Sequence, residues 1–266
     1  MSSPARLSVQ LYSIREALAA DRDGTLARLA ALGYRHVEPC GLGQWDLSPA
    51  ERAEEARALR AALDRAGLAV SSVHAAVAAG DLAPLVEECR ILGADTVFVP
   101  VPQMVEGFDG SVFSDADQLR AFAARLTEAA EELAAYGIRL GYHNHAFEWA
   151  ELPDGRTGFD VFWELAGEAV LAELDVYWAT VAGQDPAAVL ERLGGRAVAA
   201  HLKDGPARQG APQTPIGTGD VDIPAALAAG RHLAWHIAEI DETELDVFAL
   251  LETNRAALLG LGSTAG

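Results

Sequence analysis

The sequence has 266 residues, half of them apolar, and a formal net charge of −19 at neutral pH. This length and apolar content suffice for the core of one α/β domain, so we expect a single domain over residues 1–266. A charge this negative repels phosphate backbones, which makes nucleic acid an unsuitable partner. A small neutral or weakly charged molecule suits the chain better.

Several further features predict a soluble cytoplasmic protein without a membrane partner. No segment approaches the ~18 uninterrupted apolar residues of a membrane span, and the start, MSSPARLSVQ, lacks the apolar stretch of a signal peptide. The two cysteines, Cys40 and Cys89, do not have CxxC spacing and lie in apolar surroundings. We therefore expect neither a disulfide framework nor a thiolate metal site. A homo-oligomer is compatible with this composition.

Taken in chain order, short β-type runs alternate with segments rich in Ala, Leu, Glu and Arg, which is typical of a parallel sheet with crossover helices. The expected strands are 7–12, 36–40, 69–75, 96–100, 139–145, 171–177, 197–204 and 234–241. The expected helices are 24–32, 49–66, 82–92, 115–136, 158–168, 186–194, 223–230 and 243–260. Eight such pairs without a linker predict an α/β fold of the (β/α)₈ TIM-barrel type. An open doubly wound sheet is the alternative, although the glycine-rich turn typical of it does not follow the first strand.

Residues at the helix ends support these boundaries. Ser48 is followed by proline and, three residues on, by Glu51, a pattern that satisfies free backbone N–H groups at a helix start. At the other ends, glycines stand just before the next strand, where a left-handed residue ends a helix without strain. These glycines are Gly33, Gly67, Gly93 and Gly137.

Polar residues gather where the expected strands end, and this end carries the active site of a TIM barrel. They are Gln10, Glu38, His74, His143, His145, Glu148, Asp175, His201, Lys203, Glu239 and Asp241. Aromatic residues in the same regions are candidates for stacking on a sugar ring, with packing in the core as the alternative. They are Trp149, Trp178 and Trp235.

Three carboxylates of this set, Glu148, Asp175 and Glu239, would repel one another in a barrel mouth unless they are paired or hold an ion. With His201 they form a set of three oxygen donors and one imidazole. Such a set suits Mn²⁺, Mg²⁺, Co²⁺ or Fe²⁺, and it also accepts Zn²⁺. One of these residues alone could instead cap a strand or form a surface ion pair. Their recurrence at the ends of strands five to eight favours one divalent metal ion.

Seven segments in this order and spacing resemble the xylose-isomerase-like superfamily of sugar isomerases and epimerases, which are TIM barrels. The segments are VQLYSIRE (9–16), GYRHVEPCG (33–41), YHNHAFEW (142–149), ELDVYWATVAGQDP (173–186), HLKDG (201–205), IGTGDVD (216–222) and AEID (238–241). The metal ligands implied by the resemblance are Glu148, Asp175, His201 and Glu239. Relatives place the first of these glutamates at the strand end itself, where this chain has His143. His143 or His145 is therefore the alternative as a ligand or proton carrier.

The resemblance also implies roles for the other polar residues. Lys203 would orient the substrate. The expected substrate contacts are Gln10, Glu38, His74 and His143. Glu148 and Glu239 would act as base and acid on opposite sides of the substrate, with His145 as an alternate proton carrier.

The implied substrate is a keto-sugar or keto-polyol, a small carbohydrate. A divalent ion would chelate its adjacent carbonyl and hydroxyl oxygens while a carboxylate removes the proton between them, giving a metal-stabilised enediolate. Return of the proton gives epimerisation or isomerisation, whereas loss of a β-hydroxyl gives dehydration, as in the inosose dehydratases of the superfamily. Lyase or hydrolytic action on oxidised glycosides and a non-catalytic sugar-binding barrel are further alternatives. An endonuclease IV type of activity is disfavoured by the negative charge.

The segment 205–222 lies where barrels often bind phosphate. It contains glycines, but its only basic residue is Arg208, so phosphorylated substrates are disfavoured. Together with 101–114 it is expected to form the rim of the site or a lid over it.

Overall fold

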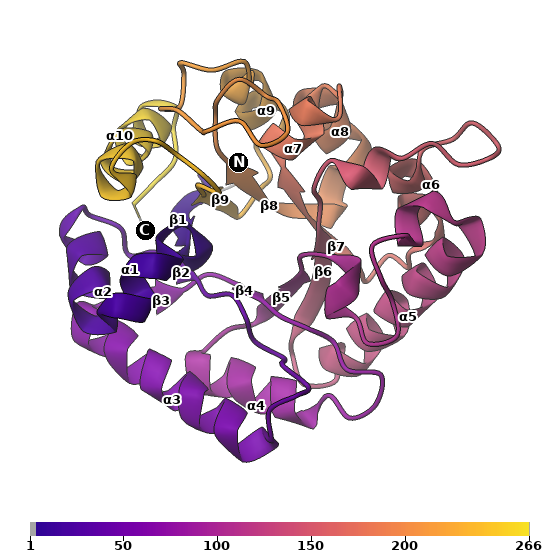
Figure 1. Ribbon diagram of the computed structural model, residues 1–266, viewed down its shortest axis with the longest axis horizontal. Helices are drawn as coiled ribbons and strands as arrows, with labels where there is room; N and C mark the ends of the chain where they lie inside the picture. Colours follow the sequence, from indigo (N-terminus) through magenta and orange to yellow (C-terminus); the bar gives the residue numbers. More distant parts are fainter. Residues whose placement is uncertain (1–3, 266) are drawn as a thin grey trace.

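The computed structural model describes residues 4–265, which form a ring of parallel strands surrounded by helices (Figure 1). The strands are β1 (Arg6–Gln10), β2 (His36–Glu38), β3 (Ala69–Val70), β4 (Val73–His74), β5 (Thr96–Val99), β6 (Arg139–His143), β7 (Leu171–Asp175), β8 (Ala197–Leu202) and β9 (Trp235–Ala238). The helices are α1 (Arg15–Ala20), α2 (Arg22–Ala31), α3 (Pro49–Ala66), α4 (Ala83–Leu92), α5 (Ala116–Ala134), α6 (Gly158–Leu165), α7 (Val176–Val181), α8 (Pro186–Leu193), α9 (Ile223–Ala229) and α10 (Val247–Gly260). No helix within residues 4–265 is long and apolar enough to cross a membrane.

The strands follow the order β3-β2-β1-β9-β8-β7-β6-β5-β4, and every recorded pair is parallel. β3 and β4 are the two halves of the expected third strand, which is interrupted at Ser71 and Ser72. Its backbone bonds to neighbours on both sides: Ser71 N–H donates to Val37 O and Ala75 N–H donates to Phe98 O, each at 3.0 Å. The sheet therefore closes into a nearly complete barrel, which confirms the (β/α)₈ prediction and excludes the open sheet.

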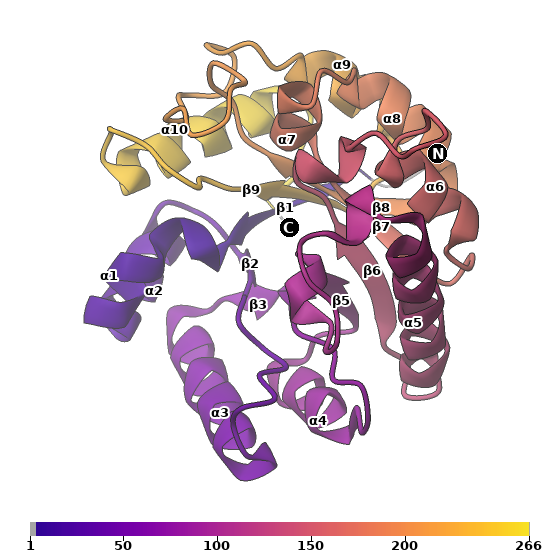
Figure 2. The same cartoon turned by 45° about the vertical axis from the view of Figure 1, so that its right-hand side comes forward.

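Each of the eight expected strands and helices has a counterpart, and residues 4–265 contain two further α-helices, α1 and α7. α1 precedes α2, and α7 begins at Val176, inside the strand that was expected to extend to residue 177. That strand ends at Asp175 because its carboxylate accepts a hydrogen bond from Trp178 N–H at 2.8 Å and so caps α7. Figure 2 shows α5 and α6 side by side on the outside of β6.

The predicted helix ends are confirmed at the level of individual hydrogen bonds. Ser48 and Glu51 exchange side-chain and backbone hydrogen bonds at the start of α3. Gly67 and Gly93 end α3 and α4 in the left-handed conformation, with φ of 69° and 72°. These caps fix where each helix turns back toward the next strand.

Side-chain alternation along the strands builds the barrel interior in layers. A small apolar layer consists of Phe98, Ala199, Trp235 and Ile237. Gly141 belongs to the same level, since a β-carbon there would lie 2.6 Å from the Phe98 ring. His201 lies two residues beyond Ala199 on β8, and Glu239 lies four residues beyond Trp235, just after β9. Both point to the same face as the apolar residue before them. The polar side chains thus lie above an apolar floor, toward the carboxyl ends of the strands.

Candidate active site

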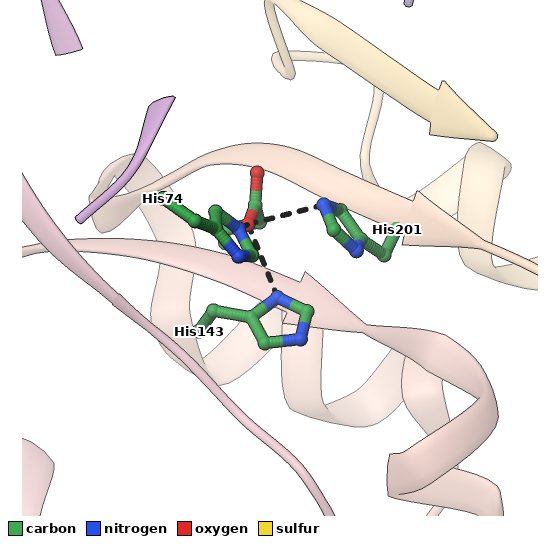
Figure 3. Close-up of side chains that lie close together, drawn as sticks. His74, His143 and His201 are labelled. Carbon is green, nitrogen blue, oxygen red and sulfur yellow. Dashed lines mark hydrogen bonds and ion pairs between the residues drawn. The ribbon is translucent and has the colours of Figure 1, made fainter. Parts of the chain in front are cut away.

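Three histidines point toward one another inside the barrel, from β4, β6 and β8 (Figure 3). The ring of His74 is stacked on that of His201, with ring centroids 5.2 Å apart, and the His143 and His201 centroids are 4.4 Å apart. All three side chains are buried. Imidazoles this close together are stable only if neighbouring carboxylates balance or orient them.

The carboxylate of Glu173, on β7, lies at the centre of the three rings. Its Oε2 atom is 2.6 Å from His74 Nε2, 3.1 Å from His143 Nδ1 and 3.2 Å from His201 Nε2. Its Oε1 atom has no hydrogen-bond partner within residues 4–265. One carboxylate oxygen therefore joins side chains from three strands.

We call the side of the histidines that faces Glu173 the inner side of the site. A second buried carboxylate, that of Glu38 at the end of β2, lies on this side. Its Oε2 atom accepts a hydrogen bond from Gln10 Nε2 at 2.8 Å and lies 2.7 Å from His201 Nε2. Its Oε1 atom accepts a hydrogen bond from the hydroxyl of Ser72, at the break between β3 and β4. His74 Nε2 lies 3.3 Å from Glu38 Oε2. The interrupted third strand thus supplies both Ser72 and His74 to the site.

On the opposite side of the histidines, which we call the outer side, three carboxylates enclose Lys203. Its Nζ atom lies 2.7 Å from Asp175 Oδ2, 2.5 Å from Glu239 Oε2 and 2.7 Å from Asp241 Oδ2. Lys203 is fully buried and is the only lysine in the sequence. Its compact ammonium carries three N–H donors, one for each of these carboxylates.

The rings of His201 and His143 connect the inner and outer sides of the site. His201 presents Nδ1 to Glu239 Oε2 at 2.8 Å, on the side opposite Glu38. His143 presents Nε2 toward Asp175 Oδ2 at 3.8 Å, while its Nδ1 faces the inner side. His143 and His201 therefore each have one nitrogen on the inner side and one on the outer side.

Burial is the largest cause of the pKa shifts here, but charged neighbours decide several directions. Burial raises the pKa of Asp175 to about 7, against the lowering by Lys203. Burial and then His201 lower the pKa of His143 well below its usual value. For Glu239, burial opposes ionisation, but Lys203 and His201 outweigh it and hold the pKa well below the usual range. A neutral His143 and an ionised Glu239 are the forms that a cation binds.

Two groups of four side chains bring their ligand atoms within 4.8 Å of one another. The inner group is His74, His143, Glu173 and His201, and the outer group is His143, Asp175, His201 and Glu239. In the outer group, Asp175 Oδ2 accepts no well-aligned hydrogen bond within residues 4–265, although Lys203 Nζ is near. Two imidazole nitrogens and two carboxylate oxygens fit a divalent ion such as Zn²⁺, Mn²⁺, Co²⁺ or Fe²⁺.

Glu148 belongs to neither group. It lies in a short 3₁₀ helix, Phe147–Trp149, where its Oε1 accepts a hydrogen bond from Tyr142 OH and its Oε2 one from His145 N–H, each at 2.8 Å. Burial raises its pKa to about 8. His143, at the end of β6, belongs to both groups, whereas Glu148 turns back to brace the segment that follows the strand.

A cavity of about 600 Å³ reaches two members of the outer group, His143 and Glu239. Its lining includes His74, His143, His145, Trp178, Glu239 and Asp241. Tyr12, Arg15 and Met104 also line it. Trp149 packs on Phe159 and Trp235 belongs to the apolar floor, so of the three tryptophans considered only Trp178 lines the cavity.

His145 combines access to the cavity with a free nitrogen. It lines the cavity, and its Nδ1 atom has no hydrogen-bond partner within residues 4–265. Burial, followed by the charge of Lys203, lowers its pKa to about 4. Its ring lies between Phe147 and Trp178, with centroids 5.6 Å and 5.9 Å away. A neutral imidazole held in this way can accept or return a proton.

The segment 205–222 is anchored by the buried carboxylate of Asp204. This carboxylate accepts hydrogen bonds from the backbone N–H groups of Gly205 (2.8 Å), Gly217 (2.8 Å), Gly219 (3.0 Å) and Val221 (3.2 Å). Converging backbone N–H groups of this kind form an anion-binding nest. Here the nest holds the chain's own carboxylate, and it is the 209–213 part of the segment that borders the cavity.

The sequence analysis gave no role to three residues of the site: Ser72, Glu173 and Asp241. Asp241 was noted at a strand end but given no role. Glu173 could have been found by the spacing that pairs it with Asp175 on one face of β7, the same spacing that links His201 and Lys203. Ser72 gives no such signal, because its contact depends on the break in the third strand.

The sequence model of a family described as xylose isomerase-like TIM barrel matches residues 26–244. The chain belongs to the xylose isomerase-like TIM-barrel family. Its members include epimerases and isomerases, and the expected resemblance is confirmed. A comparison with curated proteins found no match.

Solved structures share the fold along nearly the whole chain. A sugar phosphate isomerase/epimerase from Parabacteroides distasonis ATCC 8503 superposes with a TM-score of 0.76 at 22% identity, covering 97% of this chain and 94% of the other. An L-ribulose 3-epimerase has a TM-score of 0.65 at 19% identity, with coverage of 97% and 94%. An IolI protein with a bound zinc atom has a TM-score of 0.66 at 14% identity, with coverage of 96% and 97%. At these identities the likeness establishes the fold alone.

Proposed function

We propose that the protein is a divalent-metal-dependent isomerase or epimerase that acts on a keto-sugar or keto-polyol. The observation that carries this proposal is the outer group, which lies beside a cavity large enough for a small sugar and lines it with His143 and Glu239. Two imidazoles and two carboxylates form a ligand set for one divalent ion. The zinc atom in the structurally similar IolI protein supports the same assignment.

A bound ion would supply Lewis-acid polarisation of the substrate's carbonyl and hydroxyl oxygens. The chain's own residues would move the proton. Glu239 lines the cavity and is held ionised, so it suits the base that removes the proton next to the carbonyl. His145, neutral and with a free Nδ1, suits the group that returns it. Glu148 is left out of the ligand set and of the proton transfer, because both its oxygens brace the segment carrying His145.

The remaining polar residues would prepare the site. Lys203 would hold Asp175 and Glu239 in place by neutralising part of their mutual repulsion. Gln10 would orient Glu38, which in turn contacts His201. Of the residues expected to contact substrate, His74 and His143 line the cavity, whereas Gln10 and Glu38 lie below it and act through the histidines.

The favoured substrate carries no phosphate group. Barrels commonly bind phosphate with backbone N–H groups of the loops after their last two strands. In this chain the converging N–H groups of the loop after β8, four in all, already donate to Asp204. Arg15 is the one cationic side chain recorded in the cavity lining besides histidines, and its guanidinium donates to the carbonyl oxygens of Tyr12 and Asp241. A neutral sugar fits this lining better than a sugar phosphate.

The first test is metal content per chain, measured by mass spectrometry after loading with Mn²⁺ and desalting. The parent should hold about one equivalent, and an Asp175→Ala, His201→Ala double variant almost none. His236→Gln is the matched control, because His236 is a buried histidine outside both groups that bonds to Ser263. Deuterium exchange from solvent into a panel of ketoses and inososes then tests the chemistry. A parent that binds metal and sugar but exchanges no deuterium is a binding protein, and the enzymatic proposal fails.

A further inference from the structure

We propose that Glu173 is a positioning residue for His143. It holds the proton of that ring on Nδ1 and leaves the Nε2 lone pair facing the outer group. The inference rests on the proposed function, since His143 belongs to the proposed ligand set. It describes the metal-free protein. Glu173 itself does not line the cavity.

The contacts of His143 are the basis of this inference. Glu173 Oε2, 3.1 Å from Nδ1, is the one hydrogen-bond partner recorded for the His143 side chain. Nε2 has only a longer approach to Asp175 Oδ2, at 3.8 Å. The backbone pairing of β6 with β7 fixes the two residues, because His143 lies directly opposite Glu173 in the register. The register therefore places the two side chains next to each other on the same face of the barrel wall.

The chemistry of the two groups then decides where the proton lies. An ionised carboxylate can only accept hydrogen bonds, and a neutral imidazole has one N–H and one lone pair. His143 is therefore expected to carry its proton on Nδ1, toward Glu173, and to present a lone pair on Nε2. A metal ion binds the nitrogen that has the lone pair, and the partner of the other nitrogen fixes the ring orientation.

Glu173 also contacts the other two histidines of the inner group through the same oxygen. His74 Nε2 lies 2.6 Å from the same oxygen and His201 Nε2 lies 3.2 Å from it. Both of these rings also face Glu38, so their orientation does not depend on Glu173 alone. His143 has no such second carboxylate on its inner side, which makes it the ring that responds most to a change at position 173.

The direct test is the tautomer of His143, read from long-range ¹H–¹⁵N spectra of metal-free protein with ring-¹⁵N-labelled histidine. A His143→Gln variant identifies the signal. The parent should show the Nδ1–H tautomer. Glu173→Met removes the acceptor and should abolish this preference, whereas Glu173→Gln keeps an acceptor oxygen and should lie between the two. A parent with the Nε2–H tautomer overturns the proposal without requiring any Glu173 variant to fold.

Titration with Zn²⁺ alone tests the consequence for the ligand set. Loss of an outer-sphere partner of a metal-bound histidine lowers metal affinity by roughly 10–100-fold, and Glu173→Met should fall in this range, with Glu173→Gln weakened less. Glu88→Gln is the control, because Glu88 is buried against Arg52 away from the site and its loss should lower stability but leave the tautomer and the affinity unchanged. Parent-like Zn²⁺ affinity and an unchanged His143 tautomer in Glu173→Met would contradict the positioning role. If the parent shows the expected tautomer but binds no metal, the proposed function fails and the assignment of Glu173 stands.

Discussion

Lys203 Nζ lies 2.7 Å from Asp175 Oδ2, and both side chains are fully buried. The same ammonium contacts Glu239 and Asp241, so one buried cation lies among three carboxylates. Burial opposes the charge on Lys203, but these carboxylates outweigh it and raise its pKa well above the usual value. Lys203 is therefore charged at neutral pH despite its burial.

Replacement of Lys203 by Met should destabilise the protein strongly, because it leaves three buried carboxylates without their cation. Removing one partner of a buried ion pair costs about 3–5 kcal/mol. Added Mn²⁺ should restore part of the loss by replacing the missing charge. Urea unfolding with and without Mn²⁺ measures both effects. Arg120→Met, which breaks an exposed pair with Asp117, should change stability by less than about 1 kcal/mol. A Lys203→Met variant as stable as the parent without metal would refute this account.

Because Lys203 is the only lysine, its burial can be tested chemically. A buried ammonium paired with carboxylates has almost no free amine to react. Acetic anhydride at pH 8.5 should leave the peptide that contains Lys203 unmodified in the folded protein and acetylate it fully in urea. Mass spectrometry of the digested protein gives the result. Rapid acetylation of the folded protein would show that the cluster opens to solvent.

Glu148 should make stability depend on pH in a defined window. Burial raises its pKa from 4.5 to about 8, so between these values the folded state keeps a proton that the unfolded chain has lost. Stability from this group is therefore fully present below pH 4.5 and is lost as pH rises toward 8. Glu148→Gln cannot ionise, so the parent should lose stability relative to this variant by an amount on the order of a few kcal/mol between pH 5 and pH 8.

Urea unfolding of both proteins at several pH values checks the Glu148 prediction. Glu244→Gln, at an exposed position, should follow the parent at all of them. Parallel stability profiles for the parent and Glu148→Gln would show that Glu148 is already ionised at low pH.

His145→Ala should separate proton transfer from metal binding. Since His145 lines the cavity and belongs to neither ligand group, metal content should stay at the parent level. Loss of a general acid or base lowers the rate about 10²–10⁴-fold, and deuterium exchange into substrate should fall by this factor. His232→Ala removes an exposed histidine outside the cavity and should have no effect. Unchanged exchange in His145→Ala would transfer the role to another residue.

Phosphate on the substrate should be disfavoured because Asp204 occupies the backbone N–H groups after β8. In a panel of ketoses tested together with their phosphate esters, the unphosphorylated member of the best pair should have at least roughly tenfold higher kcat/KM, the effect of about 1.4 kcal/mol. Inorganic phosphate should not inhibit. A preference for the ester would mean that another part of the rim, such as Arg15, binds phosphate.

The sequence predicted the fold well because alternating strands and helices with capped ends are local signals. It did not predict the break at Ser71 and Ser72, which depends on how the third strand meets both of its neighbours. It also extended the sixth strand beyond Asp175, because the residues that follow are apolar and β-branched or aromatic, and only the capping bond of Asp175 shows that a helix begins.

The site was harder to predict than the fold, for reasons of geometry. Polar residues at strand ends identified the correct end of the barrel, and the structure brings His143, Asp175, His201 and Glu239 together there. Glu148 lies five residues beyond its strand end, so sequence distance alone could not show that it turns toward Tyr142. Glu173 was missed because it lies one layer deeper than the strand end, where an apolar residue is the usual expectation.

The anchoring of the loop by Asp204 also limits how this chain and its relatives can vary. A β-carbon at Gly219 would lie 2.3 Å from Asp204 Oδ1, 2.3 Å from Gly205 N and 2.4 Å from Gly205 O, so no other residue fits at position 219 in this loop. The constraint comes from the loop's own hydrogen bonds and not from the sugar. Sequences that keep this loop should therefore keep glycine at position 219 whatever substrate they use.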